Sequence, residues 1–174
     1  MTTKEITTRD FKRAVAFHGH TCPGLYIGYR AAKLAMKELG IERAMDEEVA
    51  VIVENNSCAV DALQSILGTT FGKGNLYFKD YGKQVYTVFN RRTGEAIRIS
   101  LREFRGGKTK EESLNILRRL SDGELFEFKK VSIPLPKPAE IYSSIKCEVC
   151  SELTMETRLR IKHGKLMCIP CFKK

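Results

Sequence analysis

The 174-residue sequence predicts an α+β fold, with helices packed on a mostly antiparallel sheet, followed by a small separate unit at the C-terminus. Apolar residues recur at helical spacing in several stretches, which predicts amphipathic helices. The segments with strand character are short, and the long apolar runs typical of a parallel sheet are missing. Four cysteines in two Cys-x-x-Cys pairs near the C-terminus predict the small unit.

Helix boundaries follow from capping residues. The second helix begins at Pro23, because proline is favoured at the first helical position, and ends at Gly40. The third begins after Asn56 or Ser57, both of which are good N-cap residues. The predicted helices cover residues 11–17, 23–39, a stretch that starts near Ser57, and 109–120.

The predicted strands are apolar or alternating segments between turn residues. The sequence Arg-Arg-Thr-Gly at 91–94 is a turn that joins two of them into a hairpin. The predicted strands cover residues 49–53, 84–90, 95–101 and 125–133. Three prolines at 134, 136 and 138 can continue neither a helix nor a sheet, so they predict a stiff linker. We therefore expect a first domain over 1–133, a linker over 134–142 and a second domain over 143–174.

The cysteine pairs of the second domain have the spacing of a zinc ribbon. Cys147 and Cys150 form one pair, Cys168 and Cys171 form the other, and seventeen residues separate the inner cysteines. Two such turns close a tetrahedron of thiolates around Zn²⁺. Two disulfides or four unrelated cysteines are the alternative. Four thiolates leave no open coordination position, so this zinc is expected to fold the segment without doing chemistry.

Composition and charge limit the kinds of partner and the cellular location that we expect for this protein. The net charge is +9, which permits nucleic-acid binding but does not require it, and the ribbon has few aromatic side chains for base stacking. No apolar run reaches the roughly twenty residues of a membrane helix. The N-terminus has no apolar signal segment. We expect a cytoplasmic protein that does not bind membranes.

A second group of metal-ligand residues lies in the first domain. His18, His20 and Cys22 fall within five residues before one helix, and Cys58 falls in the first turn of another. Unpaired amides at a helix start stabilise a thiolate, the form that binds metal or acts as a nucleophile. If the two helix starts converge, these residues form a site for zinc, with nickel or iron as alternatives. A capped turn, a buried structural cysteine and a nucleophilic Cys22 with a histidine base remain open.

Two further features accompany this group. Asp61 lies three residues after Cys58 on the same helix face, where it could orient a ligand or act as a catalytic acid or base. A glycine-rich loop follows that helix and is a candidate anion cradle, with a plain flexible connection as the alternative. The candidate binding residues of the loop are Gly72, Lys73, Gly74 and Asn75.

Three motifs of the first domain occur together in one order. They are Phe17-His18-Gly19-His20-x-Cys22-Pro23-Gly24 with Gly28-x-Arg30, then Glu54-Asn55-Asn56-x-Cys58-x-x-Asp61-Ala62-x-Gln64, then Gly68-x-Thr70-x-Gly72-x-Gly74-Asn75-Leu76. This set resembles the FmdE family of formylmethanofuran dehydrogenase proteins. The resemblance implies an α+β domain, a homodimer, a C-terminal ribbon as an appendage, and a link to a molybdenum or tungsten oxidoreductase in a non-catalytic role. It also implies a metal site, which we place on Cys58 and Cys22 first, then His18, then His20.

Three functions are consistent with these residues. The first is a metal-binding accessory protein of a molybdenum or tungsten oxidoreductase, or a sensor of metal or redox state. The second is a metal-dependent enzyme in which the core metal keeps an open position for a small substrate and Asp61 transfers protons. The third is a nucleic-acid-binding regulator that uses the ribbon, which the modest charge of the ribbon does not favour.

Overall fold

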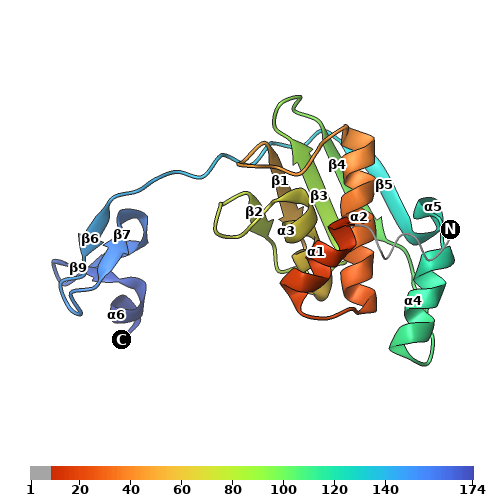
Figure 1. Cartoon of the computed structure of the whole chain (residues 1–174). Helices are drawn as coiled ribbons and strands as arrows, with labels where there is room; N and C mark the ends of the chain where they lie inside the picture. The colour runs from red at the N-terminus through yellow and green to blue at the C-terminus, as the bar shows by residue number, and fades with distance from the viewer. Residues whose placement is uncertain (1–8) are drawn as a thin grey trace. The chain divides into compact units, whose positions relative to one another are not determined.

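A computed structural model describes residues 9–174 of the chain (Figure 1). The chain forms two compact units, of which the first ends at Pro138 and the second covers Ala139–Lys174. The first unit contains the main sheet and five of the helices, and the second contains two small hairpins and a short helix.

The sheet of the first unit has five strands in the order β2-β1-β3-β4-β5. The strands are β1 (Val49–Val53), β2 (Leu76–Phe78), β3 (Val85–Asn90), β4 (Ala96–Leu101) and β5 (Phe126–Val131). Only β1 and β2 pair in parallel, while the other neighbours are antiparallel. Every residue of β1 is buried, which is why its sequence is a continuous apolar run. The predicted α+β class with a mostly antiparallel sheet is confirmed.

Helices α1 (Arg9–His18), α2 (Pro23–Leu39) and α3 (Cys58–Leu67) cover one face of this sheet (Figure 1). They enclose the main core, whose largest fully buried side chains include Phe11, Tyr26 and Tyr86. Gly40 and Gly68 end α2 and α3 in the left-handed conformation, with φ of 59° and 73°. Glycine takes this conformation without strain, so α2 stops where the sequence predicts and α3 stops at the start of the glycine-rich loop.

The contact between α2 and α3 depends on glycine. A Cβ placed on Gly28 would lie 2.2 Å from the carbonyl oxygen of Ala59, and one placed on Gly24 would lie 3.2 Å from the Cβ of Cys58. The two glycines are one helical turn apart, so they form a flat strip on α2 against which the first turn of α3 packs. The missing side chains let the starts of the two helices approach closely.

A helix pair follows β4. Helix α4 (Lys110–Arg119) begins with a capping box between Thr109 and Glu112, and the single-turn helix α5 (Asp122–Leu125), which was not predicted, precedes β5. The buried Arg30 guanidinium of α2 donates hydrogen bonds to the carbonyl oxygens of Leu117 and Leu120. These contacts satisfy carbonyls at the end of α4 and tie it to α2.

The beginning of the proline-rich segment packs on the first unit. The Arg91 guanidinium donates to the carbonyl oxygens of Pro136 (2.6 Å) and Lys137 (3.3 Å). The hydroxyl of Tyr77 also donates to the carbonyl oxygen of Lys137. Because proline has no backbone N–H, this segment contributes carbonyl acceptors, and the donors come from the side chains beside it.

The second unit is small and has few buried side chains. Its elements are β6 (Ser144–Lys146), β7 (Leu153–Met155), the 3-10 helix η2 (Glu156–Arg158), β8 (Leu159–Lys162), β9 (Lys165–Cys168) and α6 (Ile169–Lys173). Strands β6 and β7 form one antiparallel pair, and β8 and β9 form the other. Its apolar cluster consists of Cys147, Met167 and Cys168 with Cys171 packed against them. The cysteines themselves therefore provide most of the interior.

Candidate metal centres

The loop between α1 and α2 positions the first cysteine. Cys22 is the N-cap residue of α2, with extended backbone, and its sulfur accepts a hydrogen bond from the amide of Leu25 at 3.3 Å. Pro23 follows as the first helical residue and sets the backbone for the turn. The side chain of Cys22 is held at the start of α2, beside the unpaired amides of the first turn.

The second cysteine begins α3. Ser57 is the N-cap, and the side-chain oxygen of Asn55 accepts hydrogen bonds from the amide (3.0 Å) and the hydroxyl (2.7 Å) of Ser57. This turn brings the chain out of β1 and aims Cys58 toward α2. The close approach at Gly24 then places the two cysteine side chains side by side.

His18 completes the group at the end of α1. One ligand atom from each of His18, Cys22 and Cys58 lies within 4.8 Å of the others. The Nε2 atom of His18 is 3.9 Å from the sulfur of Cys22, and Nδ1 is 2.7 Å from a carboxylate oxygen of Asp61. A proton on Nδ1 donated to Asp61 leaves Nε2 free to bind a metal beside the two sulfurs.

The two thiols of this group lie close enough to influence each other's charge. Burial, together with the neighbouring Cys22, raises the pKa of the Cys58 thiol. Two thiolates at this separation are stable only if a positive charge lies between them. The set of two sulfurs and one imidazole suits Zn²⁺, and three protein ligands leave one position of a tetrahedron for water or another ligand.

The remaining predicted residues of this site lie around the three-residue group. His20 is exposed and is outside the group, and its ring lies 4.5 Å from that of His18, centroid to centroid. Asp61 does not belong to the group either, but contacts it through His18. The other carboxylate oxygen of Asp61 accepts a hydrogen bond from the amide of Gln64 at 3.4 Å.

Gln64 links the core site to the glycine-rich loop, a role that sequence reasoning did not assign. Its side-chain oxygen accepts a hydrogen bond from the amide of Phe71 at 3.2 Å. The signal was present in the sequence, because Gln64 follows Asp61 by three positions on one helix and therefore shares its face. Gly28 was also assigned no role, although a glycine inside a helix costs stability and so indicates a close contact.

Two of the predicted cradle residues, Lys73 and Asn75, hold the loop to a neighbouring segment. The Lys73 ammonium donates to the carbonyl oxygens of Met45 and Asp46, and the buried Asn75 amide donates to the carbonyl of Val49 at 2.9 Å. The amide of Thr70 donates to the side-chain oxygen of Asn75. Gly72 has open space at its Cβ position, and Gly74 adopts a positive φ of 77°. Anion binding by this loop stays a prediction.

The four ribbon cysteines also converge. Their sulfurs lie within 4.8 Å of one another. Amides of Cys150 and Cys168 donate to the sulfur of Cys147 and lower the pKa of its thiol to about 6, while the neighbouring Cys168 thiol raises the pKa of Cys171 to about 12. Four crowded thiols can all ionise only around a cation, so the arrangement is that of a closed structural zinc site.

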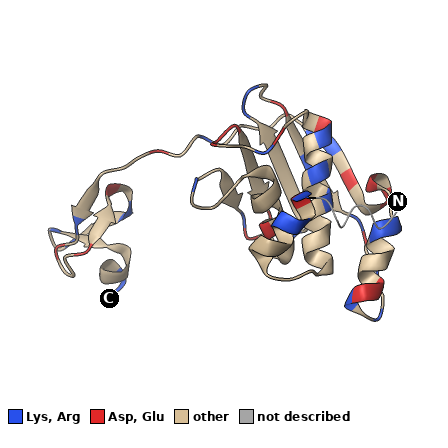
Figure 2. Ribbon diagram, viewed as in Figure 1, with Lys and Arg blue, Asp and Glu red and all other residues tan. Residues whose placement is uncertain are grey.

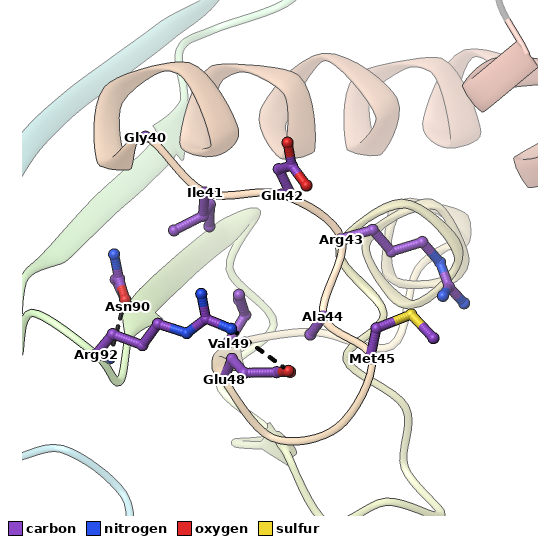
Figure 3. Close-up of a pocket in the computed structure, with 10 residues that line it drawn as sticks. All are labelled: Gly40, Ile41, Glu42, Arg43, Ala44, Met45, Glu48, Val49, Asn90 and Arg92. Carbon is purple, nitrogen blue, oxygen red and sulfur yellow. Dashed lines mark hydrogen bonds and ion pairs between the residues drawn. The ribbon is translucent and has the colours of Figure 1, made fainter.

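A pocket of the first unit lies among other residues. It has a volume of about 390 Å³, and none of the predicted site residues lines it (Figure 3). At this pocket, a guanidinium nitrogen of Arg92 lies 3.8 Å from a carboxylate oxygen of Glu48. The lining residues are Gly40, Ile41, Glu42, Arg43, Ala44, Met45, Glu48, Val49, Asn90 and Arg92. With no nucleophile or metal-ligand cluster, the pocket does not compete with the cysteine sites as a centre of chemistry.

Lys and Arg occur on both units and are interleaved with Asp and Glu (Figure 2). No helix among residues 9–174 has the length and apolarity needed to cross a bilayer.

Comparison with known proteins identifies the family. Residues 17–130 match the model described as "FmdE, Molybdenum formylmethanofuran dehydrogenase operon". The chain belongs to this family. Residues 140–174 match a second model, that of the prokaryotic dksA/traR C4-type zinc finger. The family domain contains the whole core site, and the zinc-finger match contains all four ribbon cysteines, so the matches support metal binding and structural zinc.

Two relatives of this FmdE-family protein extend the comparison. A probable S-adenosyl-L-methionine-binding protein of Archaeoglobus fulgidus is 30% identical over 94% of this chain, and the chain spans about half the length (52%) of that relative. The crystal structure of a tungsten formylmethanofuran dehydrogenase FmdE-like protein from Syntrophus aciditrophicus has a TM-score of 0.70 and 25% identity. That match covers 92% of this chain and 89% of the other.

Proposed function

We propose that this FmdE-family protein holds a transition metal, zinc first, at His18, Cys22 and Cys58, in addition to the structural zinc of the ribbon. The observation that carries the proposal is the convergence of three ligand atoms from three segments within 4.8 Å. The contact between His18 and Asp61 supports it, because metal-binding histidines commonly donate their second ring N–H to a carboxylate.

The chemistry available at this centre is that of an open site. A metal held by three protein ligands keeps a position for water or a small ligand and polarises what it binds. His18 supplies Nε2 and is oriented by Asp61, while the two sulfurs offset the charge of a divalent ion. The exposed imidazole of His20 lies beside that of His18, with 4.5 Å between the ring centroids, and is our candidate for exchanging protons with a bound ligand.

Metal analysis of the purified chain tests this proposal. We expect two equivalents of metal per chain in the wild type and one in the Cys22→Ser, Cys58→Ser double variant. Serine at position 22 is itself a good N-cap, so the variant separates loss of metal from loss of α2. A His20→Ala variant is the matched control and should keep both equivalents. Equal metal content in the wild type and the double variant would contradict the core site.

The wider role that we propose is that of an accessory protein for a molybdenum or tungsten oxidoreductase. The description of the family and the name of the Syntrophus protein support this proposal. Co-expression with such an enzyme, followed by isolation of a stoichiometric complex that contains molybdenum or tungsten, tests it. A complex that persists in the double serine variant would mean that docking does not require the core metal.

The Archaeoglobus relative adds a second candidate, an enzyme or sensor that binds S-adenosylmethionine. The name of that relative and its match over 94% of this chain support this candidate. Isothermal titration of the full chain with S-adenosylmethionine, with S-adenosylhomocysteine as a second ligand, would detect binding. Light scattering of the same sample tests the predicted homodimer. No heat of binding for either ligand would remove this candidate.

A further inference from the structure

The two core cysteines form a pair whose chemistry extends beyond metal binding. Their sulfurs lie within 4.8 Å of each other and are both free thiols. Cys58 is the more exposed of the two, since it is half-buried whereas Cys22 is only 6% exposed. A reachable thiol next to a protected one is the arrangement of a dithiol that reacts in two steps, with one attacking and one resolving sulfur.

We propose that Cys22 and Cys58 are a redox-active dithiol, and that a small-molecule disulfide converts them into a Cys22–Cys58 disulfide. The proposal rests on the proposed function in one respect, since it makes oxidation the event that empties the core metal site. Two of the three ligands are consumed by the new bond, and His18 alone cannot retain the ion.

The geometry needs little rearrangement. A disulfide has an S–S length of about 2.05 Å, so the sulfurs have to approach by about 3 Å at most. Cys22 is the N-cap of α2 and Cys58 the first residue of α3, so both side chains project from helix starts. The glycine strip at Gly24 and Gly28 keeps those starts adjacent, so the packing of α2 on α3 brings the thiols together.

The reaction balances in two exchange steps. The thiolate of Cys58 attacks one sulfur of the small-molecule disulfide, forms a mixed disulfide and releases one thiolate. The thiolate of Cys22 then attacks the sulfur of Cys58 in the mixed disulfide, forms the Cys22–Cys58 bond and releases the second thiolate. The two protein thiols lose two electrons and two protons, and the small-molecule disulfide becomes two thiols.

Oxidised glutathione and peptide mapping test the proposal on the full zinc-loaded chain. After incubation, remaining thiols are blocked with N-ethylmaleimide and the protein is digested with trypsin without reduction. Cleavage at arginine and lysine places Cys22 in the peptide 14–30 and Cys58 in the peptide 44–73, while the ribbon cysteines fall in 147–158 and 166–173. We expect the linked pair 14–30 with 44–73, together with release of one equivalent of metal to a chromogenic chelator.

Single variants identify the order of attack. In Cys22→Ser the resolving thiol is missing, so a stable glutathione adduct on Cys58 is expected. In Cys58→Ser the remaining Cys22 is buried, so its adduct should form at least about tenfold more slowly. Equal rates would overturn the assignment of Cys58 as the attacking thiol.

The redox proposal and the metal proposal fail separately. Two equivalents of metal in the reduced protein, with no linked pair after oxidation, would overturn the dithiol while leaving the metal site intact. A linked pair that forms in a protein with only one equivalent of metal would support the dithiol and contradict the metal site. A linked pair without release of metal would overturn the coupling between oxidation and the core metal.

Discussion

The two cysteine centres of this chain are built in opposite ways. In the core site, three ligands come from a helix end, an N-cap and a helix start, and all are supported by a large apolar core. In the ribbon, four ligands come from two short turns, and the buried cluster consists mainly of those same cysteines. The packing of the first unit therefore holds the three core side chains together, whereas we expect the ribbon to need its zinc in order to fold.

The largest expected effect is on the ribbon. Cys168→Ser removes a buried sulfur from the zinc site and should unfold residues 139–174, because binding of structural zinc supplies about 10–16 kcal/mol in small zinc-finger peptides. We expect rapid proteolysis of that segment and loss of one equivalent of metal, with the thermal unfolding of the first unit unchanged. Ile161→Ala, at a 72% exposed position, is the control and should stay folded. A protease-resistant ribbon in Cys168→Ser would mean that this unit folds without its zinc site.

The reverse case is a change that damages the core site through packing alone. Gly28→Ala adds a Cβ that would lie 2.2 Å from the carbonyl oxygen of Ala59, so α3 has to move away from α2. We expect destabilisation of the first unit by about 1–3 kcal/mol, as for other overpacked contacts, together with weaker binding of the core metal. The measurements are chemical denaturation and competition with a metal chelator.

Gly123→Ala serves as the matched control, because a Cβ at Gly123 meets no atom within 4 Å. The ribbon zinc should be unaffected in both glycine variants. If Gly28→Ala binds the core metal as tightly as the wild type, the position of Cys58 does not depend on the contact between the helices.

The contrast also explains how far sequence reasoning reached. The ribbon ligands are two local pairs, so spacing alone predicted the cluster. The fold class and the starts of α2 and α3 followed from local patterns and caps. The distance between Cys22 and Cys58 did not, because it depends on how α2 crosses α3 at Gly28, which is a tertiary contact between segments far apart in the chain.

Short elements were missed for a related reason. Strand β2 has three residues and is specified by its parallel pairing with β1, and the single turn α5 is specified by its caps and by the contact with Arg30. Neither element is long enough to show a period of its own. The hydrogen bond between Asp61 and His18 spans 43 positions, so only the face of α3, and not the partner, was predictable.

The last prediction concerns the hydrogen bond between Asp61 and His18. Asp61→Asn keeps the size of the side chain but removes the charge that accepts from Nδ1 of His18 at 2.7 Å. A contact of this kind orients the imidazole and raises its basicity, and its loss typically weakens metal binding by about 10–100-fold. The ribbon has no histidine ligand, so its zinc affinity should not change. Chelator competition, which resolves the two equivalents separately, measures both affinities in one experiment.

Glu103→Gln, which removes an exposed carboxylate that pairs with Arg105, is the control for the change in net charge. It should leave both affinities at the wild-type values. Gln64→Ala removes the contacts to the other oxygen of Asp61 and to the Phe71 amide but leaves the bond between Asp61 and His18, so it should weaken core binding less than Asp61→Asn does. If Asp61→Asn leaves the core affinity unchanged while Cys22→Ser abolishes it, the end of α1 alone holds His18 in place. The contacts around the site would then position only the two cysteines at the helix starts for metal binding.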